Sequence, residues 1–153
     1  KLLTALKLKQ TELAQKSGKY VPLAVKIAPD MDDAAIKILA DTFVQQGVDA
    51  VIATNPTSSR EGVEGLPHAE EQGGLRGQPV KDRSDPVLDV LVTHLQGKIP
   101  VIAVGGISSA EDAVNKLRLG ASLVQVYTGF IYQGPALIQN CVQACIRNSR
   151  NSA

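Results

Sequence analysis

Apolar residues follow two alternating patterns along this chain of 153 residues. Continuous apolar runs of strand length alternate with segments in which apolar residues recur every three or four positions. Continuous runs are typical of strands buried on both faces of a parallel sheet, and the second pattern is typical of amphipathic helices. The runs lie at Val21–Ile27, Ala50–Ala53, Val101–Val104 and Leu123–Tyr127.

Helix signals surround each of these strands. Gly18 is a plausible stop for a first helix over Lys1–Ser17, and Asp30 or Asp32 can cap the second helix. Ser108 and Glu111 have the spacing of a capping box, which leaves the free N–H groups of that helix facing the preceding turn. A third helix is expected over Pro86–Gln96, and a last one over Pro135–Ile146 buries Ile138, Cys141, Val142 and Cys145.

The predicted order is a helix followed by four strand–helix pairs, which implies parallel strands with helical crossovers. Such alternation gives a doubly wound sheet or a β/α barrel. Glycine turns follow the last two strands at Gly105-Gly106 and Thr128-Gly129, and Phe130–Tyr132 leaves room for a short extra helix. In a β/α barrel these features form a phosphate cradle after the last two strands.

Four strands do not close a barrel. A half-barrel would leave two open edges and an uncovered apolar face. The length fits a single domain over residues 1–153. Lys1 falls inside a predicted helix, which indicates a piece of a longer protein. Residues 55–85 show neither the strand pattern nor the helix pattern and are rich in Gly and Pro. We therefore expect this segment to be a functional loop folded against a ligand.

Composition excludes several classes of function. The formal net charge is +1, which gives no footprint for nucleic acid, and no apolar run is long enough to span a membrane. Cys141 and Cys145 lie one helical turn apart, poorly placed for a disulfide, and no spacing of Cys or His suggests a metal site.

The predicted carboxyl ends of the strands collect one cation, one amide, hydroxyls and backbone donors: Lys26, Thr54, Asn55, Gly105, Gly106, Tyr127, Thr128 and Gly129. No Ser–His–Asp set and no pair of carboxylates is among them. Such a site suits a phosphorylated cofactor that brings its own reactivity. Structural readings stay open, because Lys26 could extend to solvent, Thr54-Asn55 could be turn residues, and the glycine pair could serve packing alone.

Several motifs in order along the whole chain resemble dihydroorotate dehydrogenases of the quinone-using, membrane-associated class. They are VKIAPD (Val25–Asp30), VIATN (Val51–Asn55), REGVEGLP (Arg60–Pro67), GGLRG (Gly73–Gly77), VIAVGGI (Val101–Ile107) and GASLVQVYTGFIYQGP (Gly120–Pro135). The resemblance is to the C-terminal half of that enzyme. It implies an α/β fold that is the C-terminal half of a TIM (β/α)8 barrel, with four βα units that would be the last four of the barrel. It implies an FMN-dependent oxidoreductase that converts dihydroorotate to orotate in pyrimidine (UMP) biosynthesis, with a quinone as electron acceptor.

The resemblance also implies roles for single residues. Lys26 corresponds to the lysine at the flavin ring, where it would stabilise negative charge on the reduced ring. Asn55 corresponds to a substrate-binding asparagine. The other FMN-binding positions are Thr54, Gly77, Gly106 and the pair Tyr127-Thr128, whose backbone holds the phosphate.

Two positions depart from the family. Pro56 stands where the family has a substrate-contacting Thr, and Arg76 stands where it has a small Ser. We expect Arg76 to matter less, because the glycines around it are intact. The serine base and the N-terminal extension that admits the quinone would precede Lys1, so we expect no catalytic base in this chain. For the complete protein we expect peripheral association with the bacterial or mitochondrial inner membrane.

Two other functions stay open. One is a flavin- or phosphate-binding half-barrel fragment without catalysis. The other is an isomerase or aldolase of a sugar phosphate, which would need carboxylates at the strand ends.

Overall fold

The computed structural model describes residues 1–151 of the chain, so residues 152–153 of the expected domain lie outside the described part. Four parallel strands form one sheet in the order β1-β2-β3-β4. The strands are β1 (Ala24–Ile27), β2 (Ala50–Ala53), β3 (Val101–Val104) and β4 (Leu123–Gln125). The helices are α1 (Leu2–Ser17), α2 (Asp33–Gln45), η1 (Gln78–Val80), α3 (Lys81–Leu95), α4 (Ala110–Arg118), α5 (Thr128–Gln133) and α6 (Pro135–Asn151). The predicted strand–helix alternation and the short extra helix are confirmed.

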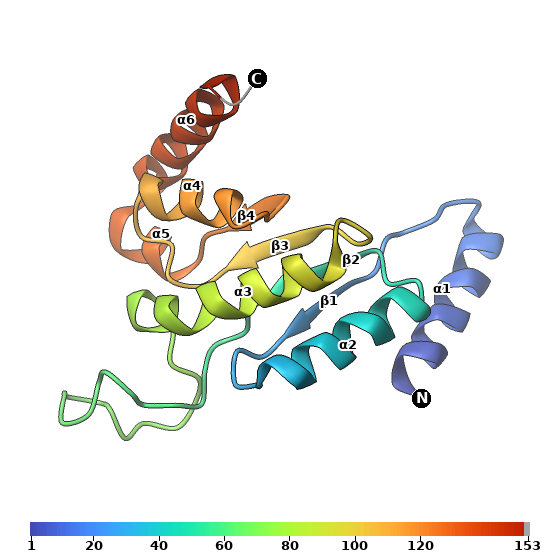
Figure 1. The fold of residues 1–153 in the computed structure, drawn as a ribbon, viewed down its shortest axis with the longest axis horizontal. Helices are drawn as coiled ribbons and strands as arrows, with labels where there is room; N and C mark the ends of the chain where they lie inside the picture. Colours follow the sequence, from blue (N-terminus) through green and yellow to red (C-terminus); the bar gives the residue numbers. More distant parts are fainter. Residues whose placement is uncertain (152–153) are drawn as a thin grey trace.

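The main core lies between the sheet and the helices α2 and α3, which pack side by side (Figure 1). Alternate strand residues point into it, so Val51, Ala53, Val101 and Ala103 are all buried. Phe43 of α2 and Leu91 of α3 cover them. A smaller cluster joins α4 to α6 through Ile107, Ala113, Leu137 and Cys141.

The opposite face of the sheet is only partly covered. Register places Lys26 beside Ile52, Ile52 beside Ile102, and Ile102 beside Leu123, in one row across the four strands. Lys26 and Leu123 are exposed, so the run Val21–Ile27 is not buried on both faces as its apolar pattern suggests. The exposed row agrees with the open face expected of a half-barrel. In a closed barrel this row would face the interior.

The strands are shorter than the apolar runs. The β1 ladder begins only at Ala24, because Pro22 has no N–H and the amide of Leu23 donates to the Asp49 carboxylate at 2.7 Å. β4 ends at Gln125, the partner of Val104, because the neighbouring chain turns away at Gly105.

Helix α3 begins at Lys81, five residues before the predicted start. Residues 81–85 carry no apolar side chain, so the hydrophobic pattern could not show this turn. Ser84 holds it in place: its buried hydroxyl donates to the carbonyl groups of Lys81 and Gly105. Pro86 then lies inside the helix rather than at its start.

The capping box of α4 is shifted by one residue from the prediction. Ser109 is the N-cap and accepts from the amide of Asp112, while the Asp112 carboxylate accepts from the amides of Ser108 and Ser109. Within α4 the amides of Asp112 and Ala113 are thus paired with Ser109, while no acceptor is recorded in the described chain for those of Ala110 and Glu111. The expectation of free N–H groups at this helix start therefore holds for two amides only.

The last helix also buries a different stripe. Leu137 and Cys141 are buried, Cys145 is half-buried, and Ile138 and Val142 are exposed. The face of α6 that packs on α4 is therefore rotated from the expected one. The expected helical stop at Gly18 and the N-cap at Asp32 are confirmed.

Candidate active site

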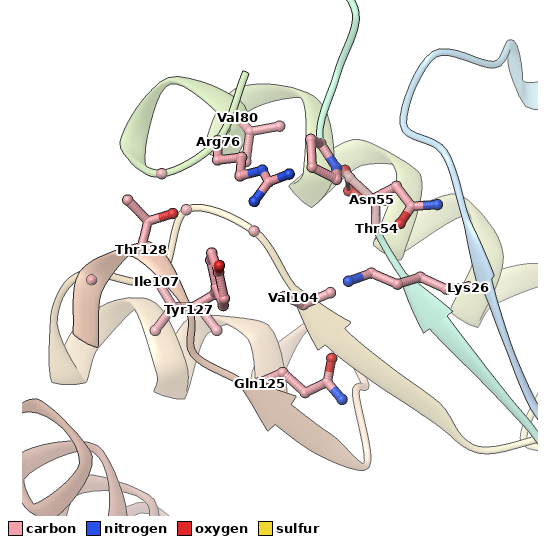
Figure 2. A pocket seen from close by; sticks show the side chains of 15 residues that line it. Lys26, Thr54, Asn55, Arg76, Val80, Val104, Ile107, Gln125, Tyr127 and Thr128 are labelled. Carbon is pink, nitrogen blue, oxygen red and sulfur yellow. Dashed lines mark hydrogen bonds between the residues drawn. The ribbon is translucent and has the colours of Figure 1, made fainter. Parts of the chain in front are cut away.

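A cavity of about 340 Å³ opens at the carboxyl ends of the four strands. Its walls come from every strand end: Lys26 from β1, Thr54 after β2, Val104 from β3 and Gln125 from β4 (Figure 2). The structure thus brings together all eight residues for which cofactor or substrate contacts were expected: Lys26, Thr54, Asn55, Pro56, Gly77, Gly106, Tyr127 and Thr128.

The cavity is positively charged. Lys26 and Arg76 line it, and none of its 15 lining residues is Asp, Glu, His or Cys. Figure 2 shows the Lys26 side chain extending from β1 into the cavity. Within residues 1–151 no ion pair or side-chain hydrogen bond is recorded for Lys26, so its ammonium group is available to an anionic or electron-rich ligand.

Thr54 and Asn55 are fixed through their backbones. The amide of Thr54 donates to Val104 at 2.9 Å, and the amide of Asn55 donates to Ile27 at 2.7 Å. Both residues thereby continue the β1–β2–β3 pairing past the end of β2. The Asn55 side chain has no recorded hydrogen bond among the described residues, which leaves its amide group free to bind a ligand.

Backbone N–H groups form the opposite wall. In the described part of the chain, the amides of Gly106, Ile107, Thr128 and Gly129 have no recorded acceptor, and all four residues line the cavity. Unpaired N–H groups gathered on one wall suit an anion with several oxygen acceptors, such as a phosphate monoester.

Packing explains why glycines occupy these turns. A Cβ on Gly106 would lie 2.4 Å from the Cβ of Lys81, and one on Gly105 would lie 3.1 Å from Ser84. Both have positive φ, +71° and +115°. The glycine pair therefore does serve helix–sheet packing, and this close approach of η1 and α3 is what sets the position of the amides.

Gly77 joins two walls of the cavity. A Cβ at this position would lie 3.0 Å from the Cγ2 of Thr128, and the φ of Gly77 is +77°. The loop that precedes α3 thus contacts the turn that precedes α5. Because the contact is backbone against side chain, a larger residue at 77 would separate the two walls.

A charged cluster lies behind the Gly105-Gly106 turn. The buried ammonium of Lys116 donates to the Oγ of Ser84 at 2.6 Å and pairs with Asp85 at 2.5 Å. Burial lowers the pKa of Lys116. Lys81 pairs with Asp112, and this hydrogen bond raises the pKa of Lys81.

The loop from Asn55 to Gly77 is folded rather than structureless. Thr57 and Leu75 exchange backbone hydrogen bonds of 3.1 and 2.8 Å, which closes the loop at its base. The Arg60 guanidinium donates to the carbonyl groups of Ala69, Glu71 and Gly73 at 2.9, 2.7 and 2.7 Å. Arg60 is the first residue of the motif REGVEGLP. Neither hydrophobic periodicity nor residue spacing indicates that its side chain holds the loop together.

Arg76, which was expected to matter less than Pro56, also lies at the cavity. Its side chain lies in the cavity wall, and its guanidinium carbon lies 5.6 Å from the centroid of the Tyr127 ring. The cavity also includes Val80, Ile107 and Gln125, which were not expected there. Gln125 could have been found from strand alternation, because it faces the same side of the sheet as Leu123.

Within residues 1–151 no group of three or more His, Cys, Asp or Glu side chains could hold a metal ion. In the same residues no helix is both long and apolar enough to cross a membrane.

The residues present fit a phosphorylated cofactor with a flat ring. Two cations and unpaired amides offer sites for an anionic group, and Val80, Val104 and Ile107 give the cavity an apolar wall. The fit follows from the donor set and the absence of carboxylates on the lining.

Comparison with known proteins assigns the chain to a family. A family model described as dihydroorotate dehydrogenase matches residues 2–147. Curated relatives named "Dihydroorotate dehydrogenase (quinone)" include one from Burkholderia multivorans, 57% identical over 95% of this chain. Another, from Pseudomonas syringae pv. tomato, is 53% identical over 99% of this chain. The chain spans only 42% and 44% of the lengths of these two proteins.

Solved structures agree. The Eimeria tenella enzyme crystallised with ferulenol superimposes with a TM-score of 0.81, at 34% identity, over 89% of this chain and 36% of that one. The ligand-free form of that enzyme gives a TM-score of 0.78. The expected half-barrel of four βα units is thereby confirmed, and this chain belongs to the dihydroorotate dehydrogenase family.

Proposed function

We propose that the full-length protein containing this chain is an FMN-dependent dihydroorotate dehydrogenase that uses a quinone as electron acceptor, in UMP biosynthesis. One observation carries the proposal. Eight residues spread from position 26 to position 128, each assigned a contact from the family resemblance, line a single cavity free of carboxylates.

Each wall of the cavity has a part in this function. Lys26 would lie at the flavin ring and stabilise the negative charge that the ring takes up on reduction. The amides near Gly106 and Thr128 would hold the phosphate, with Thr54 and Gly77 as further flavin contacts. Asn55, beside Pro56, would bind the pyrimidine ring of dihydroorotate or orotate. The cofactor would supply the redox chemistry by accepting a hydride.

The rest of the enzyme would come from residues before Lys1. We propose that this chain is the C-terminal half of one FMN-binding barrel and that the preceding half carries the serine base. Quinone access and peripheral attachment to the bacterial or mitochondrial inner membrane would also belong to that part. The name of the curated relatives supports the quinone assignment.

The test uses purified full-length protein under anaerobic conditions. We expect a flavin absorption spectrum that bleaches on addition of dihydroorotate and returns on addition of a soluble ubiquinone analogue. NAD⁺ and fumarate should not restore it. If the protein binds FMN but dihydroorotate does not reduce it, the result would instead support a flavin-binding half-barrel without catalysis. The cavity lining, which has no Asp, Glu, His or Cys, would be compatible with that function.

A further inference from the structure

Arg76 is a cation at the wall of the cavity, and the described part of the chain offers it no carboxylate partner. Figure 2 shows its side chain reaching from the loop before η1 toward the space above Tyr127. The guanidinium lies over the Tyr127 ring, 5.6 Å from the centroid, a distance at which a cation is attracted to the ring face. Stacking of this kind restrains the group in a position facing the cavity.

Within residues 1–151 no hydrogen bond and no ion pair is recorded for the Arg76 guanidinium, and this distinguishes it from neighbouring arginines. Arg60 donates to a set of loop carbonyls, and Arg83 pairs with Asp30 and Glu61. No ion pair is recorded for Arg76, and no carboxylate lines the cavity it faces. A guanidinium offers several donors in a planar fork that matches two oxygens of one phosphate group.

The backbone places Arg76 beside the unpaired amides. Its neighbour Gly77 approaches the side chain of Thr128 so closely that a Cβ would lie 3.0 Å from it. The amides of Thr128 and Gly129 have no acceptor in the described chain. Lys26, the other cation of the cavity, comes from β1 on the opposite side (Figure 2).

We infer that Arg76 is a specificity-determining residue that contacts the phosphate monoester of the bound cofactor. The inference rests on the proposed function and extends it. The backbone amides would hold the phosphate in either case, and the guanidinium adds a charged contact that a small Ser at this position could not supply. Riboflavin is the same flavin without the phosphate. The protein with Arg76 should therefore prefer FMN over riboflavin more strongly than it would with a Ser at position 76.

The test measures flavin affinity rather than turnover. Flavin is removed from the full-length protein, and FMN and riboflavin are titrated by quenching of flavin fluorescence. Arg76→Gln should raise the Kd for FMN by about tenfold and leave the Kd for riboflavin within about twofold, as for the loss of one charge-assisted contact. Arg76→Lys should lie between the two, because it keeps the charge without the fork.

Arg118→Gln is the matched control, since it removes the same charge from α4 without lining the cavity. It should leave both constants unchanged. Inorganic phosphate should compete with FMN more weakly in Arg76→Gln than in the wild type. Equal weakening of FMN and riboflavin, or no weakening of either, would overturn the role of Arg76. Failure of the wild type itself to bind FMN would overturn the proposed function, and this inference with it.

Discussion

Pro56 lies directly after the asparagine expected to bind substrate, where the resemblance implies a Thr. Proline offers no hydroxyl and no N–H, and it restricts the residue before it to extended conformations. The structure shows how tightly the ring is held, because a Cβ on Gly74 would lie 2.4 Å from the Pro56 Cβ. The ring therefore restricts the backbone of Asn55 and packs closely against the glycine loop at Gly74.

Replacing Pro56 by Thr should strengthen substrate binding. A neutral hydrogen bond is worth about 0.5–1.5 kcal/mol, and more if its absence leaves a buried polar group of the substrate unpaired. We expect the KM for dihydroorotate to fall by roughly tenfold or more in the full-length Pro56→Thr enzyme. Steady-state kinetics and retained flavin measure this. FMN affinity should not change, and equal KM values would show that Asn55 does not depend on residue 56.

Lys26→Ala should lower the reduction potential of the bound flavin and slow its reduction. A charge-assisted hydrogen bond is worth about 1.5–3 kcal/mol, which is ~30–60 mV for a two-electron couple. Spectroelectrochemical titration of the full-length protein measures the shift. Affinity for oxidised FMN should suffer less, because the amide wall is intact. Lys19→Ala, an exposed lysine outside the cavity, is the control, and a potential equal to the wild type in Lys26→Ala would mean that Lys26 merely extends to solvent.

At the scale of elements, the α4 cap joins two parts of the site. Burial alone would raise the pKa of the Asp112 carboxyl, but hydrogen bonds from Lys81, Ser108 and Ser109 together lower it to about 2. The carboxylate thus connects α3, the turn after β3 and the start of α4. A depressed pKa in the folded state stabilises the fold above the ordinary carboxyl range and loses this contribution as the pH falls toward 2.

Asp112→Asn should therefore destabilise the full-length protein by about 2 kcal/mol at pH 7, which corresponds to a shift of nearly two pKa units. The difference from wild type should shrink between pH 4 and pH 2, where the wild-type carboxyl becomes protonated. Urea unfolding at several pH values measures this. Glu111→Gln, at the adjacent exposed position, should have little effect. A difference that does not vary with pH would assign the loss to packing alone.

Arg60→Lys should loosen the loop between β2 and α3 without unfolding the sheet. Lysine cannot donate to three carbonyl groups in the geometry that the guanidinium provides. We expect cleavage within residues 61–73 by a nonspecific protease to accelerate by roughly tenfold or more, while the midpoint of global unfolding moves little. Arg118→Lys is the control. Unchanged cleavage would mean that the Thr57–Leu75 pairing alone holds the loop.

The sequence predicts strands and the location of the site well, and it predicts element ends poorly. Buried parallel strands produce unbroken apolar runs, and their carboxyl ends meet at one edge, so Lys26, Asn55 and Thr128 could be placed together. The ends depend on contacts from distant residues. Two residue pairs have the capping-box spacing, Ser108 with Glu111 and Ser109 with Asp112. The second pair forms the cap in the structure, and its Asp112 also makes an ion pair with the distant Lys81.

Contacts between polar side chains could not be predicted from the sequence either. No local pattern shows that Arg60 ties the loop, or that Ser84 of a polar turn is buried under Gly105. The contact of Arg76 with Tyr127, fifty-one positions later in the chain, could not be read from the residues around Arg76. Such pairings are tertiary, and no periodicity encodes them.

At the scale of the whole molecule, the sheet of the described chain has two free edges, at β1 and β4, and one face that is only partly covered. Leu123 on that face is 60% exposed, and several leucines of α1 are exposed as well. Free edges and exposed apolar surface favour association between copies. The 153-residue chain alone should therefore self-associate or lack fixed side-chain packing.

Sedimentation of the purified chain, together with near-UV circular dichroism, tests this expectation. We expect species larger than a monomer, or a monomer with a weak near-UV spectrum. The full-length protein, measured in parallel, should give a strong near-UV signal and a cooperative thermal transition. A monodisperse monomer of the 153-residue chain with its own cooperative transition would contradict the half-barrel interpretation.

The walls of the cavity come from the ends of all four strands, and this has a thermodynamic consequence. A ligand that contacts every strand end binds only while the strands keep their register, so its binding free energy adds to the stability of the sheet by mass action. At a free concentration one hundred times Kd the added stability is about 2.7 kcal/mol. If the ligand is the proposed flavin, its supply would set how much of the folded protein escapes degradation, and a shortage of flavin would lower the amount of the protein.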